Sequence, residues 1–358
     1  MVPTLNQLRA HAISESLFHP TTLKAALEQM SFVQADPIRS PARAQDLILR
    51  HRVRGYQADQ LDRSYSELDV EEDILYAYGF LPRHVWQLLQ PRKITGLGHL
   101  EKRVLETVKQ CGETHPKELQ AHLGRRRVIN DWGGHSVATT RTLELLHRRG
   151  LLRIARREKG IRIYEPARPH DASITPDERL RKLILIIAAI LAPAPEKSLR
   201  ATVTRYRQWG DPRTAVDTLI RTGELEKQLA DGMAYVWPAR AKTYADSPRH
   251  VRFLAPFDPL VWDRRRFEHF WGWPYRFEAY TPLSQRVRGY YAMPLLWEDC
   301  VVGWANVGVS DKRLSVEPGF IGKCPSGPDF RFELEREVES LKIFLRLGPT
   351  VATSIAWP

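Results

Sequence analysis

Cysteine is scarce in this sequence, and its three copies stand far apart. Cys111, Cys300 and Cys324 show no C-x-x-C spacing within 358 residues. This usage fits reduced thiols in a cytosol and argues against a cysteine-based zinc site. The twelve histidines form no H-E-x-x-H pattern, which zinc hydrolases use to hold their metal. We therefore expect neither a metal site nor a cofactor.

Several common motifs and targeting segments are also missing. The sequence contains neither a G-x-x-x-x-G-K-[ST] loop nor a dinucleotide fingerprint, which would have indicated phosphate-binding loops. The N-terminal residues lack the basic stretch and apolar core of a secretory signal. The most apolar run, 183–192, is about half of the roughly 20 residues that a membrane span requires. A buried helix is the better interpretation of this run.

Positive charge is in clear excess. The chain carries 54 Lys and Arg against 42 Asp and Glu, a formal net charge of +12. Such a field attracts phosphate backbones, and the planar fork of arginine suits phosphates and base edges. A basic protein can also be merely soluble, so composition alone leaves nucleic acid as one of two interpretations.

The stretch Phe32-Val33-Gln34-Ala35-Asp36-Pro37 carries an amide and a carboxylate two positions apart. In an extended segment these two side chains face the same side. Pro37 disfavours the helical conformation for Asp36. Ser40 is then a plausible cap for a helix over 40–52 with Pro41 at its first position. The pattern predicts a polar pair beside a helix start. A purely structural alternative stays open, because Asp before Pro is also a common turn element and a buried Gln often satisfies loop backbone.

A repeat of helices and hairpins occupies the middle of the chain. The spacing predicts helices over 100–111, from His115, and over 136–149, followed by a hairpin that turns at Lys159-Gly160. It then predicts helices over 177–191, 197–206 and 211–221, and a hairpin that turns at Asp231-Gly232. In both copies a proline falls six residues after the turn glycine. Three helices and a two-stranded wing, twice over, are typical of tandem winged helices.

The C-terminal part is rich in aromatic residues. We expect strands over 274–281, 286–293 and 300–309, a turn-rich insertion over 312–328, and a closing helix over 332–347. Altogether we predict an α+β fold in which tandem winged-helix units precede an antiparallel, small-barrel-like domain. The expected domains are an N-terminal winged-helix-like domain over 1–95, further winged helices over 96–170 and 171–245, and the β-rich domain over 246–358.

Three blocks of the chain carry a resemblance to a known family. They are Phe32-Val33-Gln34-Ala35-Asp36 with Ala42-Arg43-Ala44, the run from Leu254 to Arg266, and the run from Gly272 to Leu296. With the winged-helix order, these blocks make the sequence similar to the AlkZ/YcaQ family of bacterial winged-helix DNA glycosylases, a crosslink-repair family. The first block resembles the family's catalytic Gln-x-Asp/Gln motif, and the two later blocks are the more specific.

The sequence departs from the family in two places. Asp36 resembles the AlkZ-type pair rather than the Gln-x-Gln form of YcaQ-like members. The segment from Tyr76 to Pro82 stands where the family tends to have a His-Ala-containing segment before its Leu-Pro. The substrate range is therefore not carried over with the resemblance.

The resemblance implies a monofunctional DNA glycosylase that hydrolyses the N-glycosidic bond of cationic alkylated purines, of the 7-alkylguanine type and including some interstrand crosslinks. Gln34 and Asp36 are the catalytic residues that it implies. A 7-alkylguanine already carries positive charge and leaves as a neutral base, so the demanding tasks are stabilising an oxocarbenium-like sugar and delivering water. Asp36 suits both tasks, and Gln34 suits orienting the water.

The partner that we expect is double-stranded DNA carrying alkylated bases, gripped by arginines near the pair and by one separate run. These arginines are Arg39, Arg43, Arg50, Arg52, Arg264, Arg265 and Arg266. No segment indicates a membrane, an obligatory protein partner or an oligomer. We therefore expect a monomer in the cytoplasm, at the nucleoid. The alternative function is a non-enzymatic winged-helix transcription regulator, which would bind DNA as well or better without the charge of Asp36.

Overall fold

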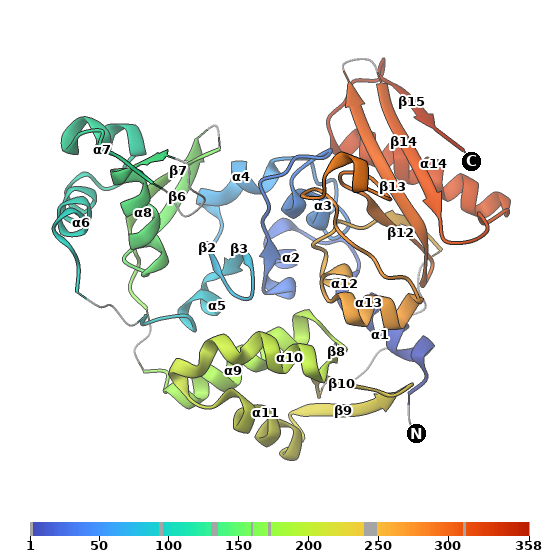
Figure 1. The fold of residues 1–358 in the computed structure, drawn as a ribbon, viewed down its shortest axis with the longest axis horizontal. Coiled ribbons are helices and arrows are strands. Elements are labelled where there is room, and N and C mark those ends of the chain that lie inside the picture. The colour runs from blue at the N-terminus through green and yellow to red at the C-terminus, as the bar shows by residue number, and fades with distance from the viewer. Residues whose placement is uncertain are drawn as a thin grey trace. The chain divides into compact units, whose positions relative to one another are not determined.

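The chain divides into two compact units. The computed structural model describes residues 3–92, 96–129, 135–158, 160–170, 173–239, 249–310 and 313–357 (Figure 1). Unit 1 joins Met1–Gln60 to Pro176–Pro358, and unit 2 is Leu61–Thr175. The division into four domains predicted above is finer than this one and stays a prediction. An α+β fold is observed, because both units contain helices and sheets.

Unit 1 begins with short helices whose first turns are capped by threonine side chains. Its first elements are α1 (Leu5–Ser16), α2 (Leu23–Met30), β1 (Val33–Gln34) and α3 (Ala44–Leu49). Thr4 and Thr22 accept hydrogen bonds from the first-turn backbone of α1 and α2. The predicted helix over 40–52 is wrong at both ends. Arg43 is extended, with ψ of 155°, so the helix begins only at Ala44 and Ser40 does not cap it.

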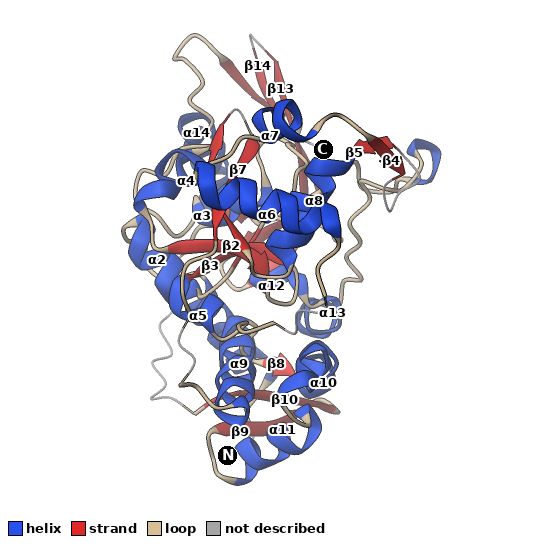
Figure 2. Ribbon diagram, turned by 90° about the vertical axis from the view of Figure 1, so that its left-hand side faces the viewer, coloured by secondary structure: helices blue, strands red, loops and turns tan. Residues whose placement is uncertain are grey.

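The central part of unit 1 is a helical segment with a hairpin. It consists of α9 (Pro176–Ile190), β8 (Ala194–Pro195), α10 (Glu196–Val203), η2 (Thr204–Trp209), α11 (Pro212–Arg221), β9 (Leu225–Ala230) and β10 (Met233–Pro238). Asp211 caps α11 with Pro212 at its first position, as predicted. The hairpin turns at Asp231 and Gly232, whose positive φ angles of 42° and 80° suit a two-residue turn. Figure 2 shows the three helices covering this small sheet.

The apolar run of the sequence forms the inner part of α9. Leu183, Ile184 and Ile187 are fully buried there, which confirms the interpretation as a buried helix. None of the helices in the described ranges is long and apolar enough to cross a membrane.

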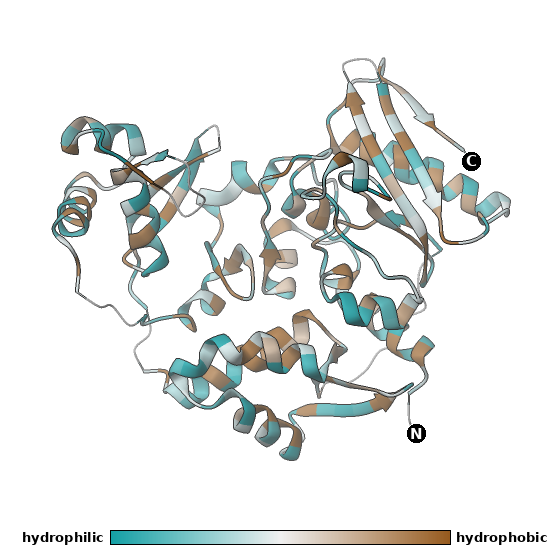
Figure 3. Ribbon diagram, viewed as in Figure 1, coloured by the Kyte–Doolittle hydropathy of each residue, from teal (hydrophilic) through white to brown (hydrophobic). Residues whose placement is uncertain are grey.

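The C-terminal part of unit 1 is a curled five-stranded sheet with one helix against it (Figure 1). Its elements are β11 (Val251–Phe253), α12 (Pro259–Trp262), α13 (Arg264–Trp271), η3 (Leu283–Gln285), β12 (Met293–Trp297), β13 (Cys300–Ser310), β14 (Arg313–Phe320), α14 (Pro328–Phe344) and β15 (Ala352–Ile355). The strands follow the order β11-β12-β13-β14-β15, antiparallel except for the parallel pair β14–β15. Apolar and polar residues alternate along β13 and β14 (Figure 3), as a sheet covered on one face requires.

Two strand predictions in this part are wrong and one is confirmed. The strand over 300–309 is present as β13, and the closing helix is present as α14. Residues 274–281 instead form a loop, and of 286–293 only Met293 is in a strand. The aromatic residues that suggested strands there are held by ring contacts, such as Trp273 against Tyr275 at 5.4 Å. Residues 313–320, predicted as part of a turn-rich insertion, form β14.

The described part of unit 2 contains three antiparallel strand pairs, five α-helices and one 3-10 helix. Its elements are α4 (Gln60–Ser64, beginning at the boundary), η1 (Tyr65–Glu67), β2 (Val70–Ile74), β3 (Tyr78–Pro82), α5 (Arg83–Gln87), α6 (His99–Cys111), α7 (Pro116–Leu123), β4 (Arg127–Ile129), β5 (His135–Val137), α8 (Ala138–Arg148), β6 (Leu152–Glu158) and β7 (Ile161–Pro166). The hairpin β6–β7 is confirmed, although Lys159 of its predicted turn lies outside the described residues. The helix predicted over 136–149 begins at Ala138, because Ser136 pairs with Val128 in β4–β5.

The predicted repeat has a structural counterpart in each unit. In unit 1, β8 lies between the first two helices and pairs with β10 through Ala194 and Val236. In unit 2, Thr114 occupies the same place between α6 and α7 and pairs with Tyr164 of β7. Both copies therefore share a helix, a short extended piece, two further helices and a closing hairpin, although unit 2 adds the pair β4–β5 between its second and third helices. The identification of these copies as DNA-binding winged helices stays a prediction.

The two sequence segments of unit 1 are joined by a common core and by buried ion pairs. Leu8, Ala12 and Ile13 of α1 pack in one apolar cluster with Phe267 and Phe270 of α13. Arg52 forms two hydrogen bonds with Asp258, at 2.8 and 3.0 Å, and both side chains are fully buried. This core brings the Gln34–Asp36 stretch and the C-terminal aromatic blocks into one unit.

Candidate active site

Gln34 and Asp36 lie at the end of β1 and in the loop that follows it. Both side chains are half-buried. The Oε1 atom of Gln34 is buried and has no hydrogen-bond partner among the described residues. A buried amide oxygen without a partner carries a desolvation cost. It is therefore an acceptor that a bound water or ligand can satisfy.

Asp36 has few partners for a carboxylate at this depth. Its Oδ1 accepts a hydrogen bond from the backbone N–H of Ile38 at 2.9 Å, which closes a small turn across Pro37. Burial raises the pKa of Asp36, and the Ile38 hydrogen bond only partly opposes that rise. At neutral pH the carboxylate is a weakly compensated negative charge with room for another donor.

Two tyrosines from the third sequence block lie close enough to this carboxylate for its charge to affect them. The hydroxyl of Tyr291 is buried and has no partner among the described residues. Burial raises the pKa of Tyr291 well above its usual value, and the negative charge of Asp36 raises it further. The same carboxylate contributes, after burial, to a raised pKa at Tyr280. The two rings belong to one aromatic group, since each packs edge-on against Phe277 at 5.3 and 6.1 Å.

The loop that carries these tyrosines is held by one carboxylate. Oε2 of Glu278 accepts hydrogen bonds from the backbone N–H groups of Val287, Arg288 and Gly289, at 3.0, 2.8 and 3.1 Å. Three such donors fix the path of the chain just before Tyr290 and Tyr291. The loop therefore presents its aromatic side chains in a defined position near Asp36.

Tyr290 and Tyr291 lie in the third sequence block, and the sequence analysis assigned neither of them a role. Tyr291 is 3% exposed and Tyr290 is 43% exposed, so only one ring is buried, although the segment is a loop rather than a strand. Tyr280 was missed as a site residue. Its place in a family-like block was the only available signal.

Two of the predicted DNA-binding arginines lie close to the pair in sequence and remain accessible. Arg39 is exposed and forms a bidentate pair with Asp59, at 2.9 and 3.2 Å. Arg43 is half-buried at the start of α3. Asp46 orders the loop that carries Asp59, because it accepts hydrogen bonds from Tyr56 Oη at 2.8 Å and from the N–H of Asp59 at 3.1 Å. Arg39 and Arg43 remain candidates for phosphate contacts.

Arg50 and Arg52 are corrected from DNA-binding residues to interior ones. The Arg50 side chain is 2% exposed, bonds to Glu337 at 2.9 Å and packs on the Phe344 ring. Arg52 is fully buried against Asp258. A guanidinium enclosed in this way cannot reach a DNA backbone without disrupting the core. The basic end of α3 thus binds C-terminal elements of its own chain.

The run Arg264–Arg266 likewise contains both an enclosed arginine and an exposed one. Arg266 is buried and donates to the backbone carbonyls of Leu191, Ala192 and Pro259, so its predicted DNA contact is also corrected. Arg264 donates to two backbone carbonyls and covers the ring of Tyr275 at 4.5 Å. Arg265 alone is exposed. Of the three, Arg265 is the one that remains available to a phosphate.

The neighbouring carboxylates have structural roles. Asp258 caps α12 and Asp263 caps α13, each by accepting a first-turn backbone N–H. Trp273 is 5% exposed within the core cluster, which favours the core role over base stacking. Among the residues that the structure describes, no group of three or more His, Cys, Asp or Glu side chains could hold a metal ion.

Comparisons with known proteins agree with this arrangement. The model of the family described as "DNA glycosylase AlkZ-like" matches residues 27–344. The solved structure of Streptomyces sahachiroi DNA glycosylase AlkZ matches with a TM-score of 0.63 at 14% sequence identity, covering 99% of this chain and 100% of that one. At this identity the structural match speaks for the fold alone. The family match spans most of the sequence and includes the Gln34–Asp36 stretch, so the chain belongs to the AlkZ-like family of DNA glycosylases.

Proposed function

We propose that this glycosylase hydrolyses the N-glycosidic bond of cationic alkylated purines in double-stranded DNA, with Asp36 and Gln34 as its catalytic residues. The 7-alkylguanine type is the expected base, including those in interstrand crosslinks. The observation that carries the proposal is the weakly compensated Asp36 carboxylate, which accepts one backbone hydrogen bond beside buried hydroxyl and amide atoms that lack partners.

The chemistry follows from the charge of the base. A cationic purine leaves as a neutral molecule, so the enzyme needs no general acid for the leaving group. Positive charge instead develops on the sugar, and the Asp36 carboxylate stabilises it electrostatically. The same carboxylate accepts a proton from the attacking water, and the Gln34 carboxamide orients that water. The reaction is monofunctional, because water and not an amine of the protein attacks the anomeric carbon.

DNA binding completes the proposal. Arg39, Arg43 and Arg265 are the arginines that we retain as phosphate contacts, since each is exposed or half-buried. The two helix-and-hairpin segments serve as winged-helix units that hold the duplex, and the protein acts as a monomer without a cofactor. The net charge of +12 supports a polyanionic partner and predicts that binding weakens steeply with salt.

The first test is release of 7-methylguanine from duplex DNA, followed by alkaline cleavage at the abasic sites. The wild-type protein should release the base, and Asp36→Asn should lose about 10²–10³ in single-turnover rate. Asp59→Asn is a matched control, because it removes a nearby exposed carboxylate that pairs only with Arg39 in the described structure. Equal rates for wild type and Asp36→Asn would discard this active site. DNA binding without release on alkylated or crosslinked duplexes would favour a non-enzymatic DNA-binding role.

A further inference from the structure

Unit 1 contains a polar cavity that is separate from the Gln34–Asp36 stretch. It is an open cavity of about 560 Å³ between the N-terminal helices and the β11–α14 region. Its lining includes no residue of the 34–36 stretch and none of the tyrosines near it. The lining residues that bear on its chemistry are Leu17, Phe18, Pro20, Arg50, His51, His250, Arg252, Arg336 and Glu337.

Arg252 lines this cavity as a partly buried positive charge, and the carboxylates of Glu337 and Glu333 attract it through space without bonding to it. The guanidinium of Arg252 forms no hydrogen bond or ion pair with any described residue, and its Nη1 is buried. Burial lowers the pKa of Arg252, but a guanidinium stays protonated at neutral pH. A buried charge without a bonded counterion is costly. The site therefore favours an anion beside Arg252.

The charged groups next to Arg252 are bonded to other partners or are neutral. The carboxylate of Glu337 already accepts hydrogen bonds from Arg50 Nη1 and from the N–H of Phe253, both at 2.9 Å. Arg50 Nη2 is buried without a partner. Burial, followed by the positive charges of Arg50, Arg252 and Arg52, holds the pKa of His51 well below its usual value. A neutral His51 therefore lines the cavity with polar atoms and adds no positive charge that would repel Arg252.

The other charged groups at the cavity are paired with one another. Arg336 bonds to Glu333 at 2.6 Å, and His250 bonds to the same carboxylate at 3.0 Å. Glu15 lines the opposite side, where it is exposed. The charged groups that remain closest to Arg252 are Glu337, which attracts it, and Arg52, which repels it.

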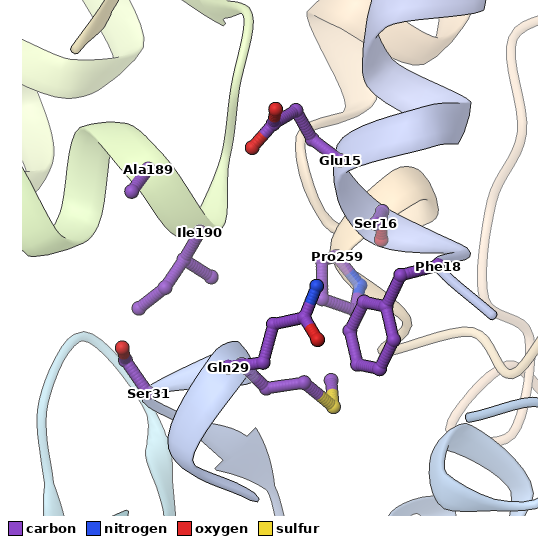
Figure 4. Close-up of a pocket in the computed structure, with 9 residues that line it drawn as sticks. Glu15, Ser16, Phe18, Gln29, Ser31, Ala189, Ile190 and Pro259 are labelled. Atoms are coloured by element: carbon purple, nitrogen blue, oxygen red, sulfur yellow. The ribbon is translucent and has the colours of Figure 1, made fainter. Parts of the chain in front are cut away.

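An apolar wall lies next to this floor. Leu17, Phe18 and Pro20 follow the end of α1 and line the cavity. A smaller cavity of about 70 Å³ adjoins it, since Glu15, Phe18 and Gln29 line both. Figure 4 shows the ring of Phe18 and the carboxamide of Gln29 at this smaller cavity, opposite Ala189 and Ile190 of α9. An organic group attached to the anion has apolar surface to rest on.

We propose that this cavity binds a phosphate group carried on a ligand up to the size of a mononucleotide, with Arg252 holding the phosphate oxygens and Phe18 covering the organic part. Arginine forks match phosphate geometry, and the cavity volume lies in the range of small-molecule sites. The phosphate can come from a free nucleotide or from a DNA strand. The site is independent of the chemistry proposed for Asp36.

The test is calorimetric titration of the full-length protein with inorganic phosphate, with dAMP, and with an oligonucleotide carrying or lacking a 5′-phosphate. Arg252→Gln should weaken binding of the phosphate-bearing probes by about 10- to 100-fold, as expected for the loss of charge-assisted hydrogen bonds. Its thermal midpoint without ligand should equal or exceed that of wild type, because the variant removes a buried unpaired charge. Arg54→Gln, which removes an exposed guanidinium outside the cavity, is the control and should bind as wild type does.

A second variant tests the cavity without changing the charge of Arg252. Ser340→Trp fills the cavity from the exposed side of α14 and should also abolish binding, without touching Arg252. Arg252-dependent binding of dAMP would identify a free nucleotide as the ligand, and Arg252-dependent binding of the 5′-phosphorylated oligonucleotide alone would identify a DNA strand. Both results support the site. Absence of binding by any probe, or equal binding by wild type and Arg252→Gln, would overturn it, whatever the rate of base release.

Discussion

The buried carboxylates of β2 in unit 2 and the Asp36 carboxylate of unit 1 differ in how their charge is compensated. Glu71 bonds to Arg153 at 2.9 Å, Glu72 bonds to Arg157 at 2.5 Å and to Tyr78 at 2.6 Å, and Asp73 bonds to Arg92 at 2.7 Å. Each β2 carboxylate therefore has at least one arginine. Asp36, in the loop after β1, accepts a hydrogen bond only from the backbone N–H of Ile38 among the described residues.

We expect this difference in partners to separate structural carboxylates from the proposed catalytic one. Burial would raise the pKa of Glu72, but the charge and hydrogen bonds of Arg157 outweigh it and lower that pKa, whereas burial raises the pKa of Glu71 despite its pairing with Arg153. At Asp36 burial prevails and the pKa is raised. A saturated carboxylate stabilises the native state and has nothing left for a substrate. A carboxylate that the fold leaves poorly compensated is available to a cationic transition state.

The largest expected effect on stability is at Glu72. Glu72→Gln leaves Arg157 without its buried partner, and breaking a buried pair in this way costs about 3–5 kcal/mol in the free energy of unfolding. Denaturant unfolding monitored by circular dichroism measures the change. Glu113→Gln is the matched control, because Glu113 pairs with Arg156 at an exposed position and its loss should change nothing measurable. Equal stability of the two variants would remove the distinction between the β2 carboxylates and surface pairs.

Tyr291→Phe sharpens the comparison from the side of the active site. The buried hydroxyl of Tyr291 has no partner in the described structure, so its removal should not lower the thermal midpoint. If the hydroxyl holds water or substrate near Asp36, the single-turnover rate should fall about 10-fold, as for one lost hydrogen bond to a charged group. Tyr290→Phe, on the more exposed neighbouring ring, should leave the rate unchanged. A destabilised Tyr291→Phe with full activity would assign Tyr291 to the core alone.

The contributions of Asp36 and Glu72 to the free energy of unfolding should change with pH in opposite directions. The raised pKa of Asp36 means that the carboxylate becomes protonated at a higher pH than an ordinary aspartate, and the rate of base release should fall through that higher pH on the acid side. The proton bound to Asp36 contributes stability below the unfolded pKa, and this is lost as pH rises through the folded pKa. Glu72, whose pKa is lowered, contributes stability above the unfolded pKa that is lost as pH falls through the folded one.

Both signs can be measured on the variants. Asp36→Asn should gain thermal midpoint relative to wild type as pH rises from the acid range to neutral, and its residual rate should lose the acid limb. Glu72→Gln should instead lose the most stability at neutral pH and least in acid. A rate profile of wild type that is flat through the acid range would exclude Asp36 as the ionised catalytic group.

Local sequence signals predicted the elements well wherever they determine the structure by themselves. The helix over 211–221 and the turn at Asp231-Gly232 depend on contacts within a few residues of the chain, and both are present. Strands predicted from residue composition and DNA contacts predicted from charge were less reliable, because tertiary contacts determine both. The aromatic run 274–281 has strand composition but packs as a loop held by Glu278 and its backbone donors.

The arginines show the same limit at the candidate site. Arg39, Arg50 and Arg52 look alike in sequence, and all belong to a basic stretch beside the Gln34–Asp36 pair. Only long-range partners distinguish them, since Glu337 and Asp258 lie 287 and 206 residues away in the chain. No local pattern indicates which guanidinium will be enclosed. The partner-free atoms of Gln34 and Tyr291 were equally beyond sequence reasoning, because an unmade bond leaves no sequence signal.

The smallest expected effect is that of Arg39 on DNA binding. It extends the comparison from buried carboxylates to an exposed arginine. If Arg39 contacts one phosphate, Arg39→Gln should reduce the slope of log affinity against log salt by about 1. Asp59→Asn keeps the Arg39 charge while removing its bidentate partner, so the slope should be kept and the affinity should rise slightly, because the guanidinium no longer has to leave a carboxylate. Fluorescence anisotropy on an undamaged duplex at several salt concentrations measures both. An unchanged slope in Arg39→Gln would place the phosphate contacts on other cations, and it would mean that exposure near the Gln34–Asp36 stretch is not enough to make an arginine part of the DNA-binding surface.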